Sequence, residues 1–130
     1  MGAERIKVLL VEDDGDSREL LAELLEADFD VSTAPDGLAG LRAFESEHPD
    51  VVVTDESLPG MLGTELAAKV KQRNPRARVI LVSGYTQVQG AEYCDVVLRK
   101  PIDVDRLSAA VGRLGDEARH WAGGGDEARQ

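Results

Sequence analysis

Three carboxylates stand where apolar runs of the sequence end. Glu12 and Asp13 follow the run Ile6–Val11, and Asp55 comes at the end of a second run that begins with Val51–Val53. A hard cation such as Mg²⁺ binds oxygen ligands, so two or three carboxylates with a backbone carbonyl are enough to hold it. Without a cation the three groups would repel, because like charges that share a site oppose one another's ionisation. The pattern predicts a site for Mg²⁺ or Mn²⁺ built around one reactive aspartate.

A hydroxyl and an ammonium group follow two further apolar runs. Val79–Val82 leads into Ser83, and Val96–Leu98 is followed by Lys100. An aspartate carboxylate is an established nucleophile that forms an aspartyl phosphate, and phosphoryl transfer depends mainly on positioning and charge neutralisation. We therefore expect Asp55 to attack in line. The metal, the Lys100 ammonium and the Ser83 hydroxyl would each hold one phosphoryl oxygen.

These groups share one site only if four strands end at the same edge of a sheet. Continuously apolar strands are typical of a parallel sheet covered by helices on both faces, and ligands bind outside the carboxyl ends of such strands. The half-polar run Val31–Ala34 fits an edge strand. The first intervening helix has its leucines at helical spacing within Leu20–Leu25, after a predicted cap at Asp16-Ser17. A strand and a helix thus alternate five times, which predicts a doubly wound α/β fold.

Composition limits the chain to one domain and narrows its partners. The 130 residues are 42% hydrophobic, which suits a single core. A formal charge of −10 with scattered Lys and Arg would repel phosphate backbones, so direct binding of nucleic acid is not expected. No apolar stretch is long enough for a bilayer, so we expect a cytoplasmic protein without membrane contact. Cys94, the only cysteine, is assigned no role.

Four stretches together closely resemble the receiver domain of two-component response regulators: VLLVEDD, DVVVTDESLPGMLGTEL, VILVSGY and VLRKPI. The resemblance runs from about residue 6 to residue 121, and it implies a flavodoxin-like five-stranded parallel sheet in the order 2-1-3-4-5. We expect residues 1–122 to form this receiver domain. Residues 123–130 are glycine-rich and polar, which predicts a flexible tail.

The resemblance also assigns roles to the site residues. It implies that Asp55 is the phosphoacceptor, that Glu12 and Asp13 bind the metal beside it, and that Ser57 offers its backbone carbonyl to the same ion. Ser83 is then the switch hydroxyl. Lys100 corresponds to the lysine that is invariant in the family, and its bond to Pro101 resembles the family's cis peptide.

Three departures from the family pattern concern how a signal would leave the site. Val97 stands where the family usually has a switch aromatic, and a small β-branched side chain has little to signal by rotating. The interval from Ser83 to Lys100 is about one helical turn short, and Gln87–Gly90 starts a helix poorly. Helix four is therefore predicted to be short, distorted or absent. Leu62 replaces a residue that is more often polar.

The resemblance implies a phosphorelay protein. Asp55 would take a phosphoryl group from the phosphohistidine of a histidine kinase or a histidine phosphotransfer protein, and the domain would signal to a downstream target or output domain. A stand-alone regulator, the receiver of a hybrid histidine kinase, and a homodimer stay open. The domain is not expected to act as an enzyme on other substrates.

Two other functions compete with this reading. A pseudo-receiver would keep the fold and bind partners without phosphorylation, which Val97 and the short helix favour and the complete set of site residues opposes. A metal-dependent phosphohydrolase would generally need a second acid two residues after the nucleophile. Glu56 is adjacent to Asp55 instead and would project to the opposite side of the strand.

Overall fold

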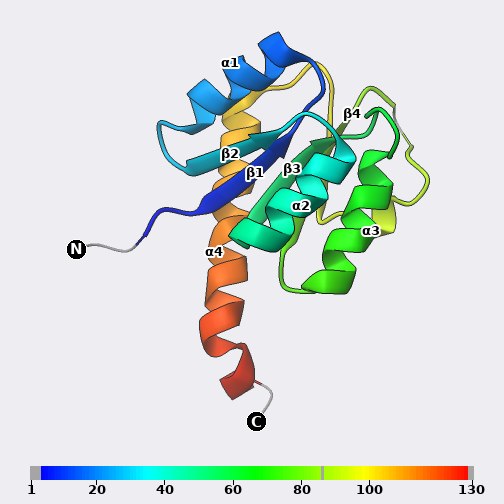
Figure 1. Ribbon diagram of the computed structural model, residues 1–130. Helices are drawn as coiled ribbons and strands as arrows, with labels where there is room; N and C mark the ends of the chain where they lie inside the picture. Colours follow the sequence, from blue (N-terminus) through cyan, green and yellow to red (C-terminus); the bar gives the residue numbers. More distant parts are fainter. Residues whose placement is uncertain (1–3, 86, 129–130) are drawn as a thin grey trace.

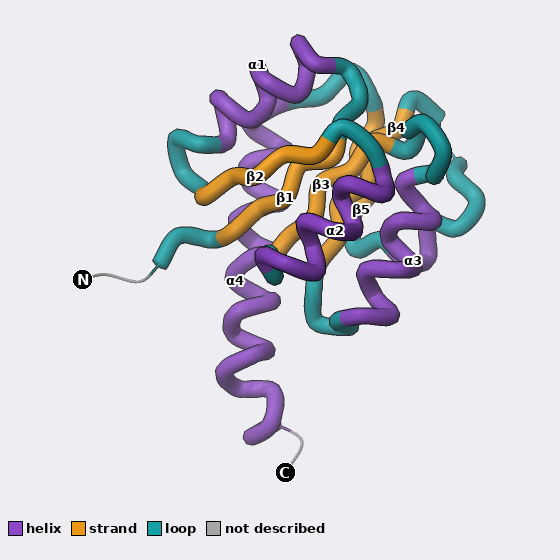
Figure 2. Tube along the Cα trace, in the orientation of Figure 1, coloured by secondary structure: helices purple, strands orange, loops and turns teal. Residues whose placement is uncertain are grey.

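The computed structural model describes residues 4–85 and 87–128. Five parallel strands form one sheet in the order β2-β1-β3-β4-β5 (Figure 2). The strands are β1 (Lys7–Val11), β2 (Asp30–Ala34), β3 (Val51–Asp55), β4 (Arg78–Ser83) and β5 (Val96–Arg99). The doubly wound α/β fold and its flavodoxin-like strand order are confirmed.

Helices cover both faces of the sheet (Figure 1). They are α1 (Gly15–Leu25), α2 (Gly37–Glu47), α3 (Gly63–Arg73) and α4 (Val104–Ala128). Successive strand residues point to opposite faces, so Val8 and Leu10 join the core under α1 and α4, whereas Leu9 and Val11 join the core under α2 and α3. Because both faces are buried, the central strands are apolar along most of their length, as the sequence indicated.

The first two α-helices begin at aspartate caps. The Asp14 carboxylate accepts a hydrogen bond from the Ser17 N–H at 2.9 Å, and the Asp36 carboxylate accepts one from the Ala39 N–H at 2.8 Å. The predicted cap of the first helix at Asp16-Ser17 was therefore wrong by two residues. The cap position needs extended backbone and an oxygen that reaches the N3 amide, and Asp14 meets both conditions.

The described residues between β4 and β5 include a single helical element, the 3-10 helix η1 (Ala91–Tyr93). Gly90 precedes it with φ +88°, a left-handed conformation that glycine adopts without steric cost. The part of the chain that the structure describes therefore has four α-helices, with η1 alone in the connection between β4 and β5. The prediction of a short, distorted or absent fourth helix is confirmed.

The last helix continues through residues 123–128 and extends beyond the edge of the sheet (Figure 1). This segment was predicted to be a tail, and residues 129–130 of that tail lie outside the described residues. An α-helix satisfies its own backbone hydrogen bonds turn by turn, so a helix anchored on the sheet can continue without further core. No helix of the described chain is long and apolar enough to cross a membrane.

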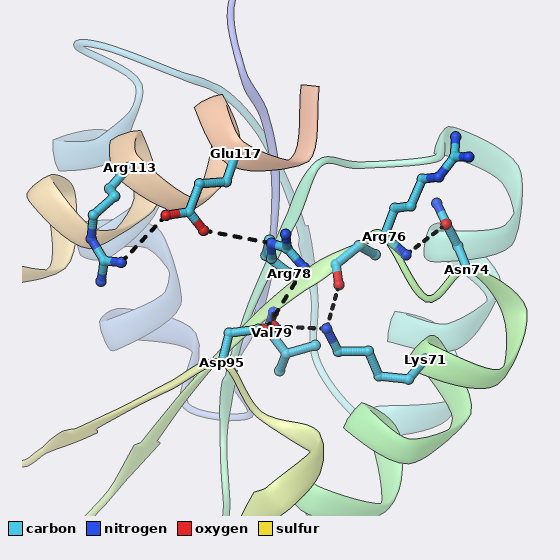
Figure 3. A network of polar contacts seen from close by, with 9 residues as sticks. Lys71, Asn74, Arg76, Arg78, Val79, Asp95, Arg113 and Glu117 are labelled. Atoms are coloured by element: carbon cyan, nitrogen blue, oxygen red, sulfur yellow. Dashed lines mark hydrogen bonds and ion pairs between the residues drawn. The ribbon is translucent and has the colours of Figure 1, made fainter. Parts of the chain in front are cut away.

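A polar network ties the elements together at the amino ends of β4 and β5 (Figure 3). The Asp95 carboxylate accepts hydrogen bonds from the Lys71 ammonium and the Val79 N–H, both at 2.8 Å. The Arg78 guanidinium lies between Asp95, at 3.9 Å, and Glu117 of α4, at 3.8 Å. These contacts connect α3, β4, β5 and α4 at the end of the sheet away from the predicted site.

Replacing Gly63 with alanine is expected to destabilise the fold. A Cβ there would lie 2.3 Å from the Asp55 carbonyl oxygen and 2.9 Å from Leu81 Cδ1, so backbone would have to move. We expect a loss of about 1–3 kcal/mol in the free energy of unfolding, as for other overpacked sites, measured by urea denaturation. Gly15→Ala is the matched control, because Gly15 also opens an α-helix and its Cβ would meet only Arg18 at 3.7 Å. Equal stabilities of the two variants would contradict the prediction.

Candidate functional site

The carboxyl ends of four strands supply the residues predicted to form the site. Glu12 and Asp13 follow β1 directly, and Asp55 is the last residue of β3. Val11 and Thr54 are register partners in the β1–β3 pairing, so Glu12 and Asp55 come next to each other at the sheet edge. β1 and β3 are also where the strand order reverses, the place where open α/β sheets bind ligands.

The three predicted carboxylates form one cluster. Glu12, Asp13 and Asp55 each offer an oxygen atom, and these atoms lie within 4.8 Å of one another. Glu12 and Asp55 are buried, with 7% of each residue exposed, whereas Asp13 is exposed. Lys100 follows β5 and places its ammonium nitrogen 3.1 Å from both carboxylate oxygens of Asp55. Among the described residues, Lys100 and Asp55 therefore form an ion pair within this cluster.

The electrostatics of the cluster favour an added cation. Burial raises the pKa of Glu12, and the nearby Asp55 charge raises it further. The Asp14 N–H opposes this by donating to Glu12 Oε2 at 3.0 Å, and Lys100 also lowers the pKa. A divalent cation would relieve the repulsion that Lys100 leaves, and hard oxygen ligands suit Mg²⁺ or Mn²⁺. The donor set thus fits the predicted metal.

An open hollow of about 560 Å³ gives access to this cluster. Ser57 lines it together with the three acids and Lys100, so the residue predicted to offer a backbone carbonyl lies at the same site. Its other wall is apolar and comes from α1, the loop before α4 and the start of α4: Leu20, Leu21, Leu24, Ile102 and Val104.

Two leucines of this wall were missed by the sequence reasoning. Leu20 and Leu24 share the helical spacing predicted for Leu20–Leu25, but they are 57% and 44% exposed, and only Leu21 and Leu25 of α1 are buried. Four leucines in six positions cover more of a helix than one buried face needs. That excess was the available signal of an exposed apolar surface.

Ser83 lies beside the acidic cluster but is bonded within its own loop. It is 1% exposed, and its hydroxyl oxygen accepts a hydrogen bond from the Tyr85 N–H at 3.0 Å. Its carbonyl accepts from the Lys100 N–H at 2.9 Å, which fixes the two predicted site residues relative to each other. The Ser83 hydroxyl proton remains available for an acceptor, because the Tyr85 N–H occupies only a lone pair of the Ser83 oxygen. Lys100-Pro101 is a cis peptide, as predicted.

The remaining singled-out residues lie away from the hollow. Val97 is 39% exposed on β5. Glu56 is buried and projects away from Asp55, and its carboxylate accepts hydrogen bonds from Thr64 N and Thr64 Oγ1 at 2.8 and 3.2 Å. Burial, followed by the charges of Glu56 and Asp95, raises the pKa of Cys94 to about 12. The Cys94 thiol is therefore protonated and unreactive at neutral pH.

Sequence comparison links the chain to a family. The sequence-family model of the response regulator receiver domain matches residues 8–112 of this chain. The transcriptional regulatory protein CseB of Streptomyces coelicolor is 37% identical over 95% of this chain. The chain spans 55% of the length of that relative.

Solved structures agree with this result. A response regulator receiver domain protein from Clostridium thermocellum has a TM-score of 0.82 and 28% identity, over 88% of this chain and 97% of that one. The response regulator TrrA of Thermotoga maritima, solved in complex with Mg²⁺–BeF, has a TM-score of 0.77 and 30% identity, over 84% and 98% of the two chains. By its matched residues, relatives and fold, the chain belongs to the response regulator receiver domain family of two-component systems.

Proposed function

We propose that this receiver domain accepts a phosphoryl group on Asp55 from the phosphohistidine of a histidine kinase or a histidine phosphotransfer protein. The contact of Lys100 with both oxygens of Asp55, inside a three-carboxylate cluster open to a hollow, is the observation that supports it. In the transfer the N–P bond breaks and an O–P bond to Asp55 forms. The electron pair of the broken bond returns to the imidazole nitrogen of the donor.

Each site residue has a part in this reaction. Asp55 supplies the nucleophilic oxygen, and Lys100 balances negative charge on the phosphoryl oxygens. Ser83 can donate its hydroxyl proton to another phosphoryl oxygen. Glu12, Asp13, Asp55 and the carbonyl of Ser57 would hold Mg²⁺ or Mn²⁺, which supplies the remaining charge neutralisation when bound.

The same geometry argues against turnover of other phosphate esters. A phosphohydrolase would need a second acid close to the nucleophile, but Glu56 is buried and bonded to Thr64 away from the hollow. We therefore propose that the domain catalyses only its own phosphorylation and dephosphorylation.

The output of the domain depends on what it contacts. Since the chain spans about half of its curated relative, a transcriptional regulator, a linked or separate output part is proposed to carry the response. A hybrid histidine kinase is one proposed parent. Nucleic acid would be reached through that part, because the net charge of this chain is −10. A homodimer is a further arrangement by which the domain could signal.

One observation favours a second function, that of a phosphorylation-independent adaptor. Val97 is small and exposed where the family has a switch aromatic, and η1 replaces the fourth helix. An adaptor of this kind would bind its partners equally well with and without phosphate. The phosphorylation experiment below separates the two functions.

Asp13→Asn is expected to weaken Mg²⁺ binding at least about tenfold. Losing even a residue that only hydrogen-bonds to a metal ligand lowers metal affinity by about that factor, and Asp13 is proposed as a direct ligand. Isothermal titration calorimetry measures it. Asp16→Asn is the control, since it removes one exposed acidic charge from the first turn of α1, outside the cluster. Equal losses in both variants would mean that net charge alone attracts the ion, and would contradict a metal site.

Acetyl phosphate or phosphoramidate is expected to add one phosphoryl group to the protein only when Mg²⁺ is present. Intact mass spectrometry measures the gain, and Asp55→Asn should show none because it lacks the nucleophilic oxygen. Circular dichroism establishes that both proteins are folded. A folded, metal-binding protein that gains no mass would point to the adaptor instead.

A further inference from the structure

A groove lies beside α3, on the side where the fold lacks its fourth helix. It has a volume of about 680 Å³. Its lining comes from the loop between β3 and α3, from the first half of α3, from η1, and from the described part of the segment between β4 and η1 (residues 85 and 87–90). In Figure 1 this yellow-green segment passes next to α3. Gly90 closes against α3, since a Cβ on it would lie 3.2 Å from Thr64 Cβ. The missing helix therefore leaves an open channel along α3.

A buried acid lies in the wall of this groove. Glu56 is 8% exposed and lines the groove, and its carboxylate accepts its two described hydrogen bonds from Thr64 alone. An ionised carboxylate can accept roughly four hydrogen bonds, so Glu56 keeps acceptor capacity toward the groove. Glu65 adds a second carboxylate to the lining. A buried charge is costly unless a partner compensates it.

Apolar and aromatic side chains form the rest of the groove. Both tyrosines of the chain line it, Tyr85 at 66% and Tyr93 at 45% exposure, together with Leu62 at 47%. Large aromatics exposed around a concave surface are typical of protein interfaces. Tyrosine faces also attract guanidinium and ammonium groups through cation–π contacts.

The charges that line the groove favour a positively charged occupant. Its described lining residues include two carboxylates and no lysine or arginine. A second copy of this chain, with a net charge of −10, would bring no surplus of positive charge to this acidic groove. A small free cation would satisfy Glu56 but leave Leu62, Val88 and the tyrosines uncovered. A basic side chain flanked by apolar residues satisfies all of them.

We propose that the groove lined by Glu56, Tyr85 and Tyr93 docks a short segment of a partner protein, in which an arginine or lysine between apolar residues reaches Glu56. Binding there needs no phosphoryl group, so it is separate from the proposed phosphoryl transfer. Failure of one leaves the other standing.

Selection of peptides on the unphosphorylated full chain tests the docking site. A phage-displayed library of random peptides is panned against the immobilised protein in buffer with Mg²⁺, which keeps cations in the acidic cluster. Enriched peptides are synthesised with a fluorophore, and their affinities are measured by anisotropy. We expect the enriched sequences to share an arginine or lysine flanked by apolar residues.

Variants locate the contact. Glu56→Gln keeps an oxygen acceptor for Thr64 and removes the charge, and Tyr93→Ala removes an exposed ring, so each should weaken binding by about tenfold or more, the scale of an interface hot spot. Replacing the basic residue of the peptide with citrulline should weaken binding to the wild type and have little further effect on Glu56→Gln. Asp16→Asn removes the same charge from the first turn of α1, outside the lining of both hollows, and should change affinity less than about twofold, well short of a hot-spot loss.

Three results would overturn the docking site. The first is a library that yields no binding peptide, and the second is a set of binders without a basic residue. The third is binding that is lost in Asp13→Asn but kept in Glu56→Gln, which would move the contact to the acidic cluster. Urea denaturation of each variant distinguishes lost binding from lost folding.

Discussion

Charge repulsion at the carboxyl edge of the sheet is the constraint on which the site depends. Parallel strands bring Glu12, Asp13 and Asp55 together whether or not a cation is present, because their positions follow from the β1–β3 register. Lys100 balances only part of this charge, at 3.1 Å from Asp55. The surrounding packing has to hold the acids in place, and the apolar cores on both faces of β1 and β3 do this.

The ion pair of Asp55 and Lys100 also spans strands that are not neighbours. β4 lies between β3 and β5, and its last residue, Ser83, accepts the Lys100 N–H through its carbonyl. A shift of the Ser83 loop would therefore move the backbone that carries Lys100. The polar network around Asp95 connects β4 and β5 at their other ends, so the pair of strands is restrained at both ends of the sheet.

Much of this arrangement was predictable because it follows from local patterns. Apolar runs and the residues after them indicated five strands and placed Asp55, Ser83 and Lys100 at one edge, and the poor helix signals of Gln87–Gly90 indicated the missing helix. The contact of Glu56 with Thr64 depends on how α3 folds back on β3, which no spacing encodes. The extent of α4 was also hidden, because glycine lowers helix propensity while an established helix extends cooperatively.

Two neighbouring residues at the end of β3 line different surfaces. Asp55, the last residue of β3, lines the acidic hollow, and Glu56, the next residue along the chain, lines the groove beside α3. Gly63 connects them, because its N–H donates to the Glu56 carbonyl while its Cα packs against the Asp55 carbonyl. Tyr85 is a second link: its ring lines the groove and its N–H holds the Ser83 hydroxyl. If the Ser83 hydroxyl moved toward a phosphoryl group on Asp55, it would release the Tyr85 N–H. Because Tyr85 also lines the groove, movement of this loop would then reach both surfaces. Such a route would not need an aromatic side chain at Val97 on β5.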